Sequence, residues 1–435
     1  MKGGRVRSFG SCRLARRAAV TIALALAACA AAVAGCSRST PVERRIIVVG
    51  IDCMDWEVTE RLLGEGKLPN LARLAESGSC GPLRTIEPLV KSPVIWTTIA
   101  TGKLPDKHGI SDALSPDGRS LMTSNLRTAR TVWDILGEHG WTVSVVGWYV
   151  TWPAEPVNGF LVSDYFRFVP GEGRPFPERL TYPASLLSEL DTLRITADEI
   201  PDLEVERLAS PGAALTEAEA RRLPVKQRFP EMQTLQRLPF DLRSLRDFIA
   251  GDLTYLGVSR RLMASHPTQF HAVYLRGLDS VSHTFWAAAH PERATFAVAQ
   301  SERLVFGETL ERYYRRADEM LGELLTAFGD SATVIVCSDH GFKGATPGAR
   351  PGGTSDHGPI GVLFMSGDGI RAGARLGEHR VQDVTPTLLA LCGLPVGEDM
   401  DGSAIEEAMT PGFLRGHPLR RVPTYEGGAG EGGSR

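Results

Sequence analysis

Short runs of apolar, β-branched residues recur along the chain, and polar or glycine-containing segments separate them. The clearest runs are residues 46–51, 142–148, 270–275, 332–337 and 362–365. Most of them show no alternation of apolar and polar positions, as expected for strands buried on both faces of a parallel sheet. The pattern therefore predicts a series of buried parallel strands.

Apolar positions at helical spacing fill many of the intervals between these runs. They predict helices over residues 68–78, 131–139, 242–264, 310–328 and 382–392. Glycine at or just after the end of four of these segments is a typical helix stop. The alternation predicts an α/β fold with a doubly wound, mostly parallel sheet flanked by helices. A chain of 435 residues is long enough for one such domain with an insertion.

One internal stretch, residues 164–239, breaks the alternation with repeated prolines and charged helical segments. We interpret it as an inserted cap between two catalytic segments, residues 46–163 and 240–410. Residues 37–45 are interpreted as a linker. Residues 411–435 form a C-terminal tail, for which the glycine-rich end predicts partial disorder.

The N-terminus has the pattern of an export signal. Several Lys and Arg residues precede an Ala/Val/Leu-rich run that ends in Val33-Ala-Gly-Cys36. Small residues before a Cys resemble a bacterial lipobox, which implies a signal peptide over residues 1–36 and lipidation of Cys36. Cys29 also fits that pattern, and an uncleaved membrane anchor is the other alternative. We expect a periplasmic lipoprotein of the cell envelope, and Ser37 favours the outer membrane.

The net charge and the cysteines exclude few classes of function. The formal net charge of -3 gives no electrostatic reason to expect nucleic-acid binding. No cysteine spacing indicates a disulfide framework or a thiolate metal site. Cys53 and Cys337 lie beside predicted strand ends and are expected to be small core residues.

Acidic residues and histidines follow several of the predicted strands. Asp52 ends the first run, and the pair Asp339-His340 follows the run at 332–337. Carboxylate oxygens and imidazole nitrogens in this mixture suit zinc, although manganese and iron tolerate such sites too. The carboxyl ends of parallel strands are where an open α/β sheet places its chemistry. The candidate metal ligands are Asp52, Asp279, His283, Asp339, His340 and His357, enough for two divalent ions.

Ser92 is the candidate nucleophile of such a site. It precedes an apolar, Thr-rich run that we expect to form a helix with Pro93 as its first residue. A hydroxyl at a helix start lies near backbone N–H groups that attract anions, and a metal ion can lower its pKa. Alternatively, Ser92 is only an N-cap, a role that serine fills well.

Taken together, these residues resemble the alkaline phosphatase superfamily, and in particular its type I phosphodiesterase/nucleotide pyrophosphatase branch. Each motif is weak alone, but their order and spacing from about residue 46 to residue 401 are specific. The motifs are Gly50-Ile-Asp52, Leu68-Pro-Asn-Leu71, Ser92-Pro93 running into Ala100-Thr-Gly102, Pro105-Asp-Lys-His-Gly109, Asp279 with His283, Ser338-Asp-His-Gly-Phe342, His357-Gly358 and Asp383-Val-Thr-Pro-Thr387.

The resemblance implies roles for these residues. One zinc ion would be held by Asp279, His283 and His357. The second would be held by Asp52, Asp339 and His340, with Ser92 close to it and counted among the metal-site residues. Ser92 would attack the phosphorus of a small-molecule phosphoric ester, and water would hydrolyse the phosphoserine intermediate.

Two departures from the family pattern leave the substrate open. Many nucleotide pyrophosphatases use Thr where this chain has Ser92, and they carry a phosphate-binding Asn where this chain has Ala113. We therefore expect cleavage of phosphodiester or pyrophosphate bonds. A phosphomonoesterase, a phosphonate hydrolase or a head-group transferase are the alternatives within the superfamily. A catalytically silent surface-binding lipoprotein is the alternative from another class.

Overall fold

The computed structural model describes residues 44–427, except for 116–117, 119–121, 169–176, 330 and 345–355. The expected leader with Cys29 and Cys36, nearly all of the linker and the glycine-rich end after residue 427 lie outside the described residues. Arg45–Arg435 is one compact unit. In the part of the chain that is described, no helix has the length and apolar character needed to cross a bilayer.

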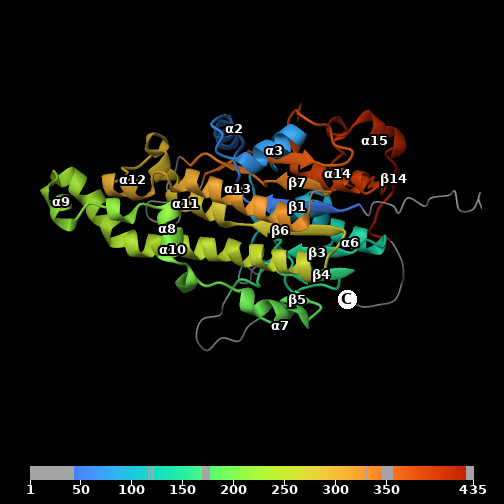
Figure 1. The fold of residues 1–435 in the computed structure, drawn as a ribbon, viewed down its shortest axis with the longest axis horizontal. Helices are drawn as coiled ribbons and strands as arrows, with labels where there is room; N and C mark the ends of the chain where they lie inside the picture. The colour runs from blue at the N-terminus through green and yellow to red at the C-terminus, as the bar shows by residue number, and fades with distance from the viewer. Residues whose placement is uncertain are drawn as a thin grey trace, which may run out of the picture. The chain divides into compact units, whose positions relative to one another are not determined.

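A ten-stranded sheet runs through this unit (Figure 1). Its strand order is β11-β2-β10-β7-β1-β6-β3-β4-β5, and β12 pairs with β2. These strands are β1 (Ile46–Ile51), β2 (Gly78–Arg84), β3 (Val143–Val146), β4 (Gly159–Val162), β5 (Thr181–Tyr182), β6 (Phe270–Leu275), β7 (Thr333–Cys337), β10 (Ile360–Ser366), β11 (Ala374–Arg375) and β12 (His379–Arg380). Two small ladders lie apart from it: β8 (Gly341–Phe342) with β9 (His357–Gly358), and β13 (Val396–Gly397) with β14 (Arg421–Val422).

The centre of the sheet is parallel. β1 lies between β6 and β7, and β3 and β4 continue the parallel order beyond β6. β10 runs antiparallel to both β7 and β2. The carboxyl ends of β1, β6 and β7 therefore meet at one edge, where chemistry is expected in such a sheet.

Helices cover both faces of the sheet, so the doubly wound α/β fold predicted from the sequence is confirmed. They are α2 (Trp56–Gly64), α3 (Pro69–Ser77), α4 (Ser92–Thr101), α5 (Pro105–His108), α6 (Val132–Glu138), α7 (Leu186–Leu190), α8 (Asp202–Leu208), α9 (Glu217–Arg222), α10 (Val225–Ser265), α11 (Gly277–Ala289), α12 (Gln300–Phe306), α13 (Thr309–Phe328), α14 (Val384–Leu391) and α15 (Pro411–Gly416).

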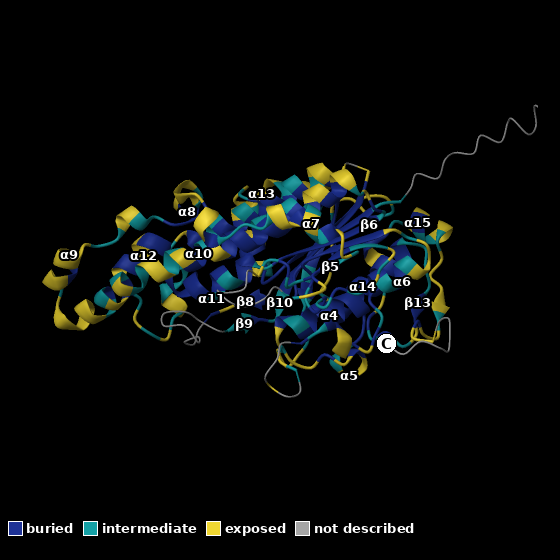
Figure 2. Ribbon diagram, turned by 90° about the horizontal axis from the view of Figure 1, so that it is seen from below, coloured by how far each residue is buried: buried dark blue, intermediate teal, exposed yellow. Residues whose placement is uncertain are grey.

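Alternate residues of β1 divide the core between the two faces. Ile47, Val49 and Ile51 pack with the helices that include α3, α10, α11 and α13. Ile46 and Val48 pack with α4, α6 and α14. Figure 2 shows these two helical layers on opposite sides of the dark blue strands. This burial on both faces explains why the strands read as continuous apolar runs.

The prediction for α10 is wrong at its N-terminal end. The helix begins at Val225 rather than at residue 242, and both Pro230 and Pro239 lie inside it. Tertiary contacts account for the difference, because the buried carboxylate of Glu231 accepts backbone hydrogen bonds from Gln300 (2.5 Å) and Ser301 (3.1 Å) at the start of α12. α10 thus passes without a break through position 239, where the proline pattern suggested the end of a cap. The division into cap and catalytic segments stays a prediction.

Candidate active site

The loops after β1 and β7 hold Asp52 and Asp339 side by side. Cys53 adopts a left-handed backbone conformation (φ 64°), which is uncommon for a residue with a side chain. In this conformation its N–H donates to Asp339 Oδ1 at 3.2 Å, and the next N–H, of Met54, donates to Ser338 Oγ at 2.8 Å. Local strain at Cys53 is therefore compensated by bonds that tie the two ligand-bearing loops together.

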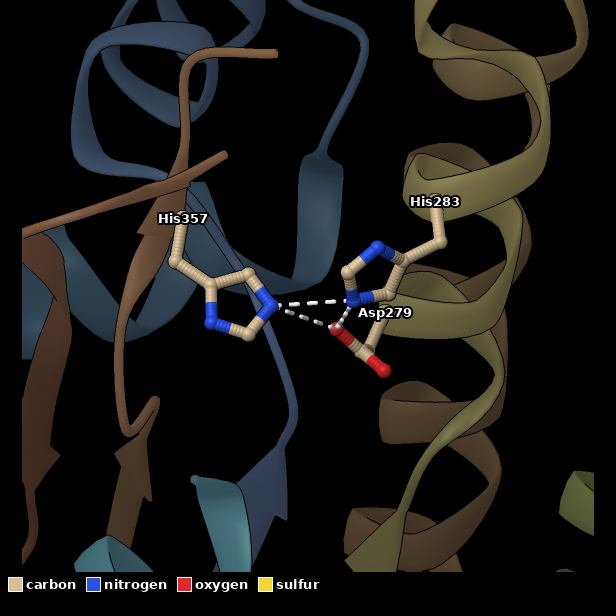
Figure 3. A group of neighbouring side chains, drawn as sticks. All are labelled: Asp279, His283 and His357. Atoms are coloured by element: carbon tan, nitrogen blue, oxygen red, sulfur yellow. Dashed lines mark hydrogen bonds and ion pairs between the residues drawn. The ribbon is translucent and has the colours of Figure 1, made fainter. Parts of the chain in front are cut away.

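Asp279 and His283 lie one turn apart on α11 rather than directly at a strand end. Their shared helical face brings His283 Nε2 to 3.3 Å from Asp279 Oδ1. His357, in β9, points at the same spot from another part of the chain (Figure 3). Its Nε2 lies 2.9 Å from His283 Nε2 and 3.7 Å from Asp279 Oδ1. These three residues form one group with the spacing needed to hold a cation.

A second group of potential ligands adjoins the first. His340 Nε2 lies 3.3 Å from Asp339 Oδ2 and 3.5 Å from Asp52 Oδ1, and all three side chains are fully buried. The rings of His340 and His357 stack with centroids 3.8 Å apart. Asp52, Asp279 and His340 also present atoms close enough to share one ion, so Asp279 lies between the two groups.

Ser92 is the first residue of α4, with Pro93 second, so the expected order was wrong by one position. The N-cap is Lys91, and no side chain caps this helix end. The interpretation of Ser92 as a mere N-cap is therefore wrong. Its hydroxyl instead lies 3.2 Å from His340 Nε2, and the side chain is nearly buried.

Electrostatics show that this cluster is suited to bind cations. Burial, followed by repulsion from Asp339 and Asp279, raises the pKa of Asp52 well above its usual value. Burial likewise raises the pKa of Asp339 to about 7. Burial also raises the pKa of Asp279, but the close imidazole of His283 and the neighbouring imidazoles outweigh it and hold that pKa low. Packed carboxylates of this kind are stabilised by a bound cation.

Carboxylate oxygens without hydrogen-bond partners also indicate a cation site. Asp52 Oδ1, Asp279 Oδ1 and Asp339 Oδ2 are buried without a hydrogen-bond partner in the described structure. A buried polar atom without a partner is costly unless something binds it. The mixture of carboxylate oxygen and imidazole nitrogen fits a borderline divalent ion such as zinc.

A cavity of about 830 Å³ opens beside this cluster. Ser92, Asp279, His283 and His357 line it, as does Ala113. Ala113 therefore contributes only a methyl group at the cavity wall, where the family pattern has an amide. Exposed Lys91 also lines the cavity.

Four further residues, which the sequence did not reveal as functional, support this site. Tyr274 donates its hydroxyl hydrogen bond to Asp52 Oδ2. Asp252 of α10 accepts the backbone N–H groups of Arg276 at 2.9 Å and Gly277 at 3.0 Å, which fixes the turn from β6 into α11. Tyr149 and Arg276 line the cavity. Only the place of Arg276, directly after a predicted strand, was a signal in the sequence.

One histidine and two tryptophans near the site are buried in the interior of the fold. His108 is buried between Thr98 Oγ1 (2.9 Å from its Nε2) and the backbone N–H of Ile110 (3.1 Å from its Nδ1). Trp148 and Trp286 are fully buried in the two core clusters. Cys53 and Cys337 are buried and free, as expected for small core residues.

Residues 46–355 match the family described as type I phosphodiesterase/nucleotide pyrophosphatase. This match covers well over half of the chain, and the protein belongs to that family. Membership supports hydrolysis of phosphoric esters by this metal-dependent group of enzymes, in agreement with the resemblance inferred from the motifs.

A curated relative is the 2,3-bisphosphoglycerate-independent phosphoglycerate mutase of Cereibacter sphaeroides (strain ATCC 17025 / ATH 2.4.3), 36% identical over 97 residues. The match covers 21% of this chain and 18% of the mutase, so it spans less than a fifth of that relative. Among solved structures, a variant of alkaline phosphatase PafA is 13% identical with a TM-score of 0.49, covering 84% of this chain and 99% of that one. Human ectonucleotide pyrophosphatase/phosphodiesterase 5 is 12% identical with a TM-score of 0.47, covering 84% and 100%.

Proposed function

We propose that the protein hydrolyses phosphodiester or pyrophosphate bonds of small molecules at a two-zinc site, with Ser92 as nucleophile. The observation that carries this proposal is the position of Ser92 Oγ, 3.2 Å from His340 Nε2 inside the cluster of six candidate ligands. Asp279, His283 and His357 would hold one ion, and Asp52, Asp339 and His340 the other. When bound, such ions lower the pKa of a nearby hydroxyl and neutralise charge on phosphoryl oxygens.

The proposed reaction has two steps. The Ser92 hydroxyl releases its proton to solvent, and its Oγ forms a bond to phosphorus while the bond from phosphorus to the leaving oxygen breaks. The electron pair departs with the leaving group. A water molecule then cleaves the phosphoserine ester and regenerates the hydroxyl. The placement of Ser92 at the start of α4 supports this role, because backbone N–H groups at a helix start favour an approaching anion.

Ala113 favours a second candidate function, which also acts on phosphoryl groups. A methyl group in place of an amide removes one donor to the phosphoryl group. A phosphomonoesterase, phosphonate hydrolase or head-group transferase is therefore the alternative. A silent binding protein is disfavoured, since a protein without catalysis has no need of a buried hydroxyl within reach of these ligands.

Turnover of bis-p-nitrophenyl phosphate and of p-nitrophenyl phosphate tests the proposal. Zinc-loaded protein lacking residues 1–36 should cleave the diester faster, and Ser92→Ala should lower kcat by roughly three orders of magnitude or more. Ser188→Ala, an exposed hydroxyl on α7, is the matched control and should retain full activity. Chelation followed by zinc addition should abolish and restore turnover. Unchanged activity in Ser92→Ala would refute the nucleophile, and faster monoester cleavage would select the phosphatase alternative.

We also propose that residues 1–36 export the protein and that lipid on Cys36 holds it to the envelope, on the periplasmic side. Small residues before Cys36 support this proposal. Cys36→Ala should block processing and prevent incorporation of labelled palmitate, whereas Cys29→Ala should not. Palmitate labelling that survives Cys36→Ala but is lost in Cys29→Ala would assign the anchor to the other cysteine.

A further inference from the structure

Arg276 brings a guanidinium group to the wall of the cavity without a carboxylate partner. It follows β6 directly, and its Nε is buried with no hydrogen bond. Among the described residues, its guanidinium makes no ion pair with an acidic side chain. An unpaired buried charge is costly, and proteins keep one mainly where a ligand supplies the opposite charge.

The nearby acidic groups act on the charge of Arg276 only from beyond ion-pair distance. The Tyr149 oxygen raises the pKa of Arg276 above its ordinary value while burial opposes it, so the side chain stays cationic. Burial raises the pKa of Tyr149 to about 12, so this phenol stays neutral. The carboxylates that interact electrostatically with Arg276 are Asp279 and Asp52, and both belong to the candidate metal ligands.

Arg167 adds a second guanidinium to the same wall. Together with Asp252, Arg167 and Arg276 also line a narrow recess that adjoins the cavity. The ion pair of Arg167 is long, at 3.9 Å from Asp247 Oδ2, and its guanidinium carbon lies 4.5 Å from the centre of the Phe168 ring. Arg167 therefore keeps hydrogen-bonding capacity for a ligand.

Asp252 interacts electrostatically with Arg167, but its carboxylate already accepts hydrogen bonds from the Arg276 and Gly277 N–H groups and the Tyr313 hydroxyl. Two further carboxylates of the wall have partners of their own. Asp164 accepts hydrogen bonds from the Val150 N–H (3.1 Å) and the Thr151 hydroxyl (3.3 Å). Asp112 accepts from the backbone of Ala113 on the exposed rim. Lys91 and Lys343 add two more cations to the lining.

We propose that Arg276 and Arg167 bind a second anionic group of the substrate, a carboxylate or a phosphate outside the phosphoryl group that is attacked. This inference rests on the function proposed above and specifies its substrate class. A cavity of about 830 Å³ holds far more than one phosphoryl group, and a paired guanidinium site recognises planar or tetrahedral oxyanions through parallel N–H donors. The substrate class is therefore phosphoric esters or anhydrides that carry a further acidic group, rather than esters of two neutral alcohols.

Matched substrates test this inference. Propyl p-nitrophenyl phosphate and 2-carboxyethyl p-nitrophenyl phosphate share a leaving group and differ by one carboxylate. The zinc-loaded protein should show at least about a tenfold higher kcat/KM on the carboxylated ester. Arg276→Gln should remove most of this preference, and Arg276→Lys should retain part of it. Arg260→Gln, on the outer surface of α10, is the matched control and should keep it whole.

A binding measurement separates the failure of this inference from the failure of the proposed function. Calorimetric titration of the zinc-loaded protein should show that 3-phosphonopropionate binds about tenfold more tightly than propylphosphonate. Arg276→Gln should remove this difference in affinity. Equal affinities in the unmodified protein would overturn the inference even if both esters are hydrolysed. An equal loss on both esters in Arg276→Gln would also overturn it and assign Arg276 to the attacked phosphoryl group. Should Arg276→Gln fail to fold, Arg276→Lys and Arg167→Gln give the same comparison.

Discussion

At the scale of single residues, the site brings like charges together. Asp52, Asp339 and Asp279 lie within one cluster, and each has an oxygen atom that is buried without a hydrogen-bond partner. Tyr274 satisfies one oxygen of Asp52 and Cys53 one oxygen of Asp339, while the facing oxygens remain available. Such an arrangement lowers the stability of the metal-free protein, and binding of cations restores that stability. This behaviour is typical of a functional site.

The candidate ligands could be predicted from the sequence because the pattern that indicates them is local. An acidic residue or histidine directly after a buried strand lies at the reactive edge of the sheet wherever that strand pairs. The roles of Tyr274 and Asp252 have no local signal. Tyr274 reads as one more apolar residue of its strand, and Asp252 acts on a turn that is 24 residues away in the chain. Their functions depend on tertiary contacts alone.

At the scale of elements, the turn from β6 into α11 positions two candidate ligands. A Cβ atom at Gly277 would lie 1.8 Å from the Tyr313 hydroxyl oxygen and 2.4 Å from Asp252 Oδ2. Tyr313 in turn donates to Asp252 Oδ2 at 2.9 Å. The first residue of α11 is therefore glycine because a carboxylate and a phenol occupy the space that a side chain needs.

Gly277→Ala should destabilise the protein by about 1–3 kcal/mol and shift the start of α11, which carries Asp279 and His283. Zinc affinity and kcat should fall together, because both depend on that helix. The measurements are chemical denaturation and zinc titration. Gly257→Ala in α10 is the matched control, since a Cβ there meets nothing within 4 Å. This control should be neutral or slightly stabilising. Normal zinc affinity in Gly277→Ala would show that the turn does not position the ligands.

The same element marks a limit of prediction from sequence. The sequence pattern predicted no element over residues 277–289, although Leu278, Val281 and Phe285 have helical spacing and are buried. The extended length of α10 is a different case. Prolines normally favour a helix boundary, and the helix continues through them because residues such as Glu231 and Arg237 contact α12.

At the scale of the whole molecule, buried neutral histidines tie the stability of the fold to pH. His271 lies in β6, 1% exposed, and its Nε2 has no hydrogen-bond partner in the described structure. Burial, with a smaller contribution from Arg45, lowers its pKa from 6.5 to about 3. His108 is similar, with a pKa lowered by burial to about 4. Both imidazoles must stay neutral for the core to remain packed.

The sign of the effect follows from proton uptake. The unfolded chain protonates His271 below about pH 6.5, whereas the folded protein resists protonation until about pH 3. The free energy of unfolding that neutral His271 contributes is fully present above the pKa of His271 in the unfolded chain. It is lost as the pH falls below that value, at up to about 1.4 kcal/mol per pH unit. Between about pH 7.5 and about pH 4.5, His271 alone should lower the free energy of unfolding by about 2–3 kcal/mol. Urea denaturation of the protein and of His271→Gln across this range isolates the effect, because His108 and the carboxylates act equally in both. The two proteins should differ in slope, with the variant less sensitive to acid, and parallel slopes would mean that His271 is protonated in the fold as easily as in the unfolded chain.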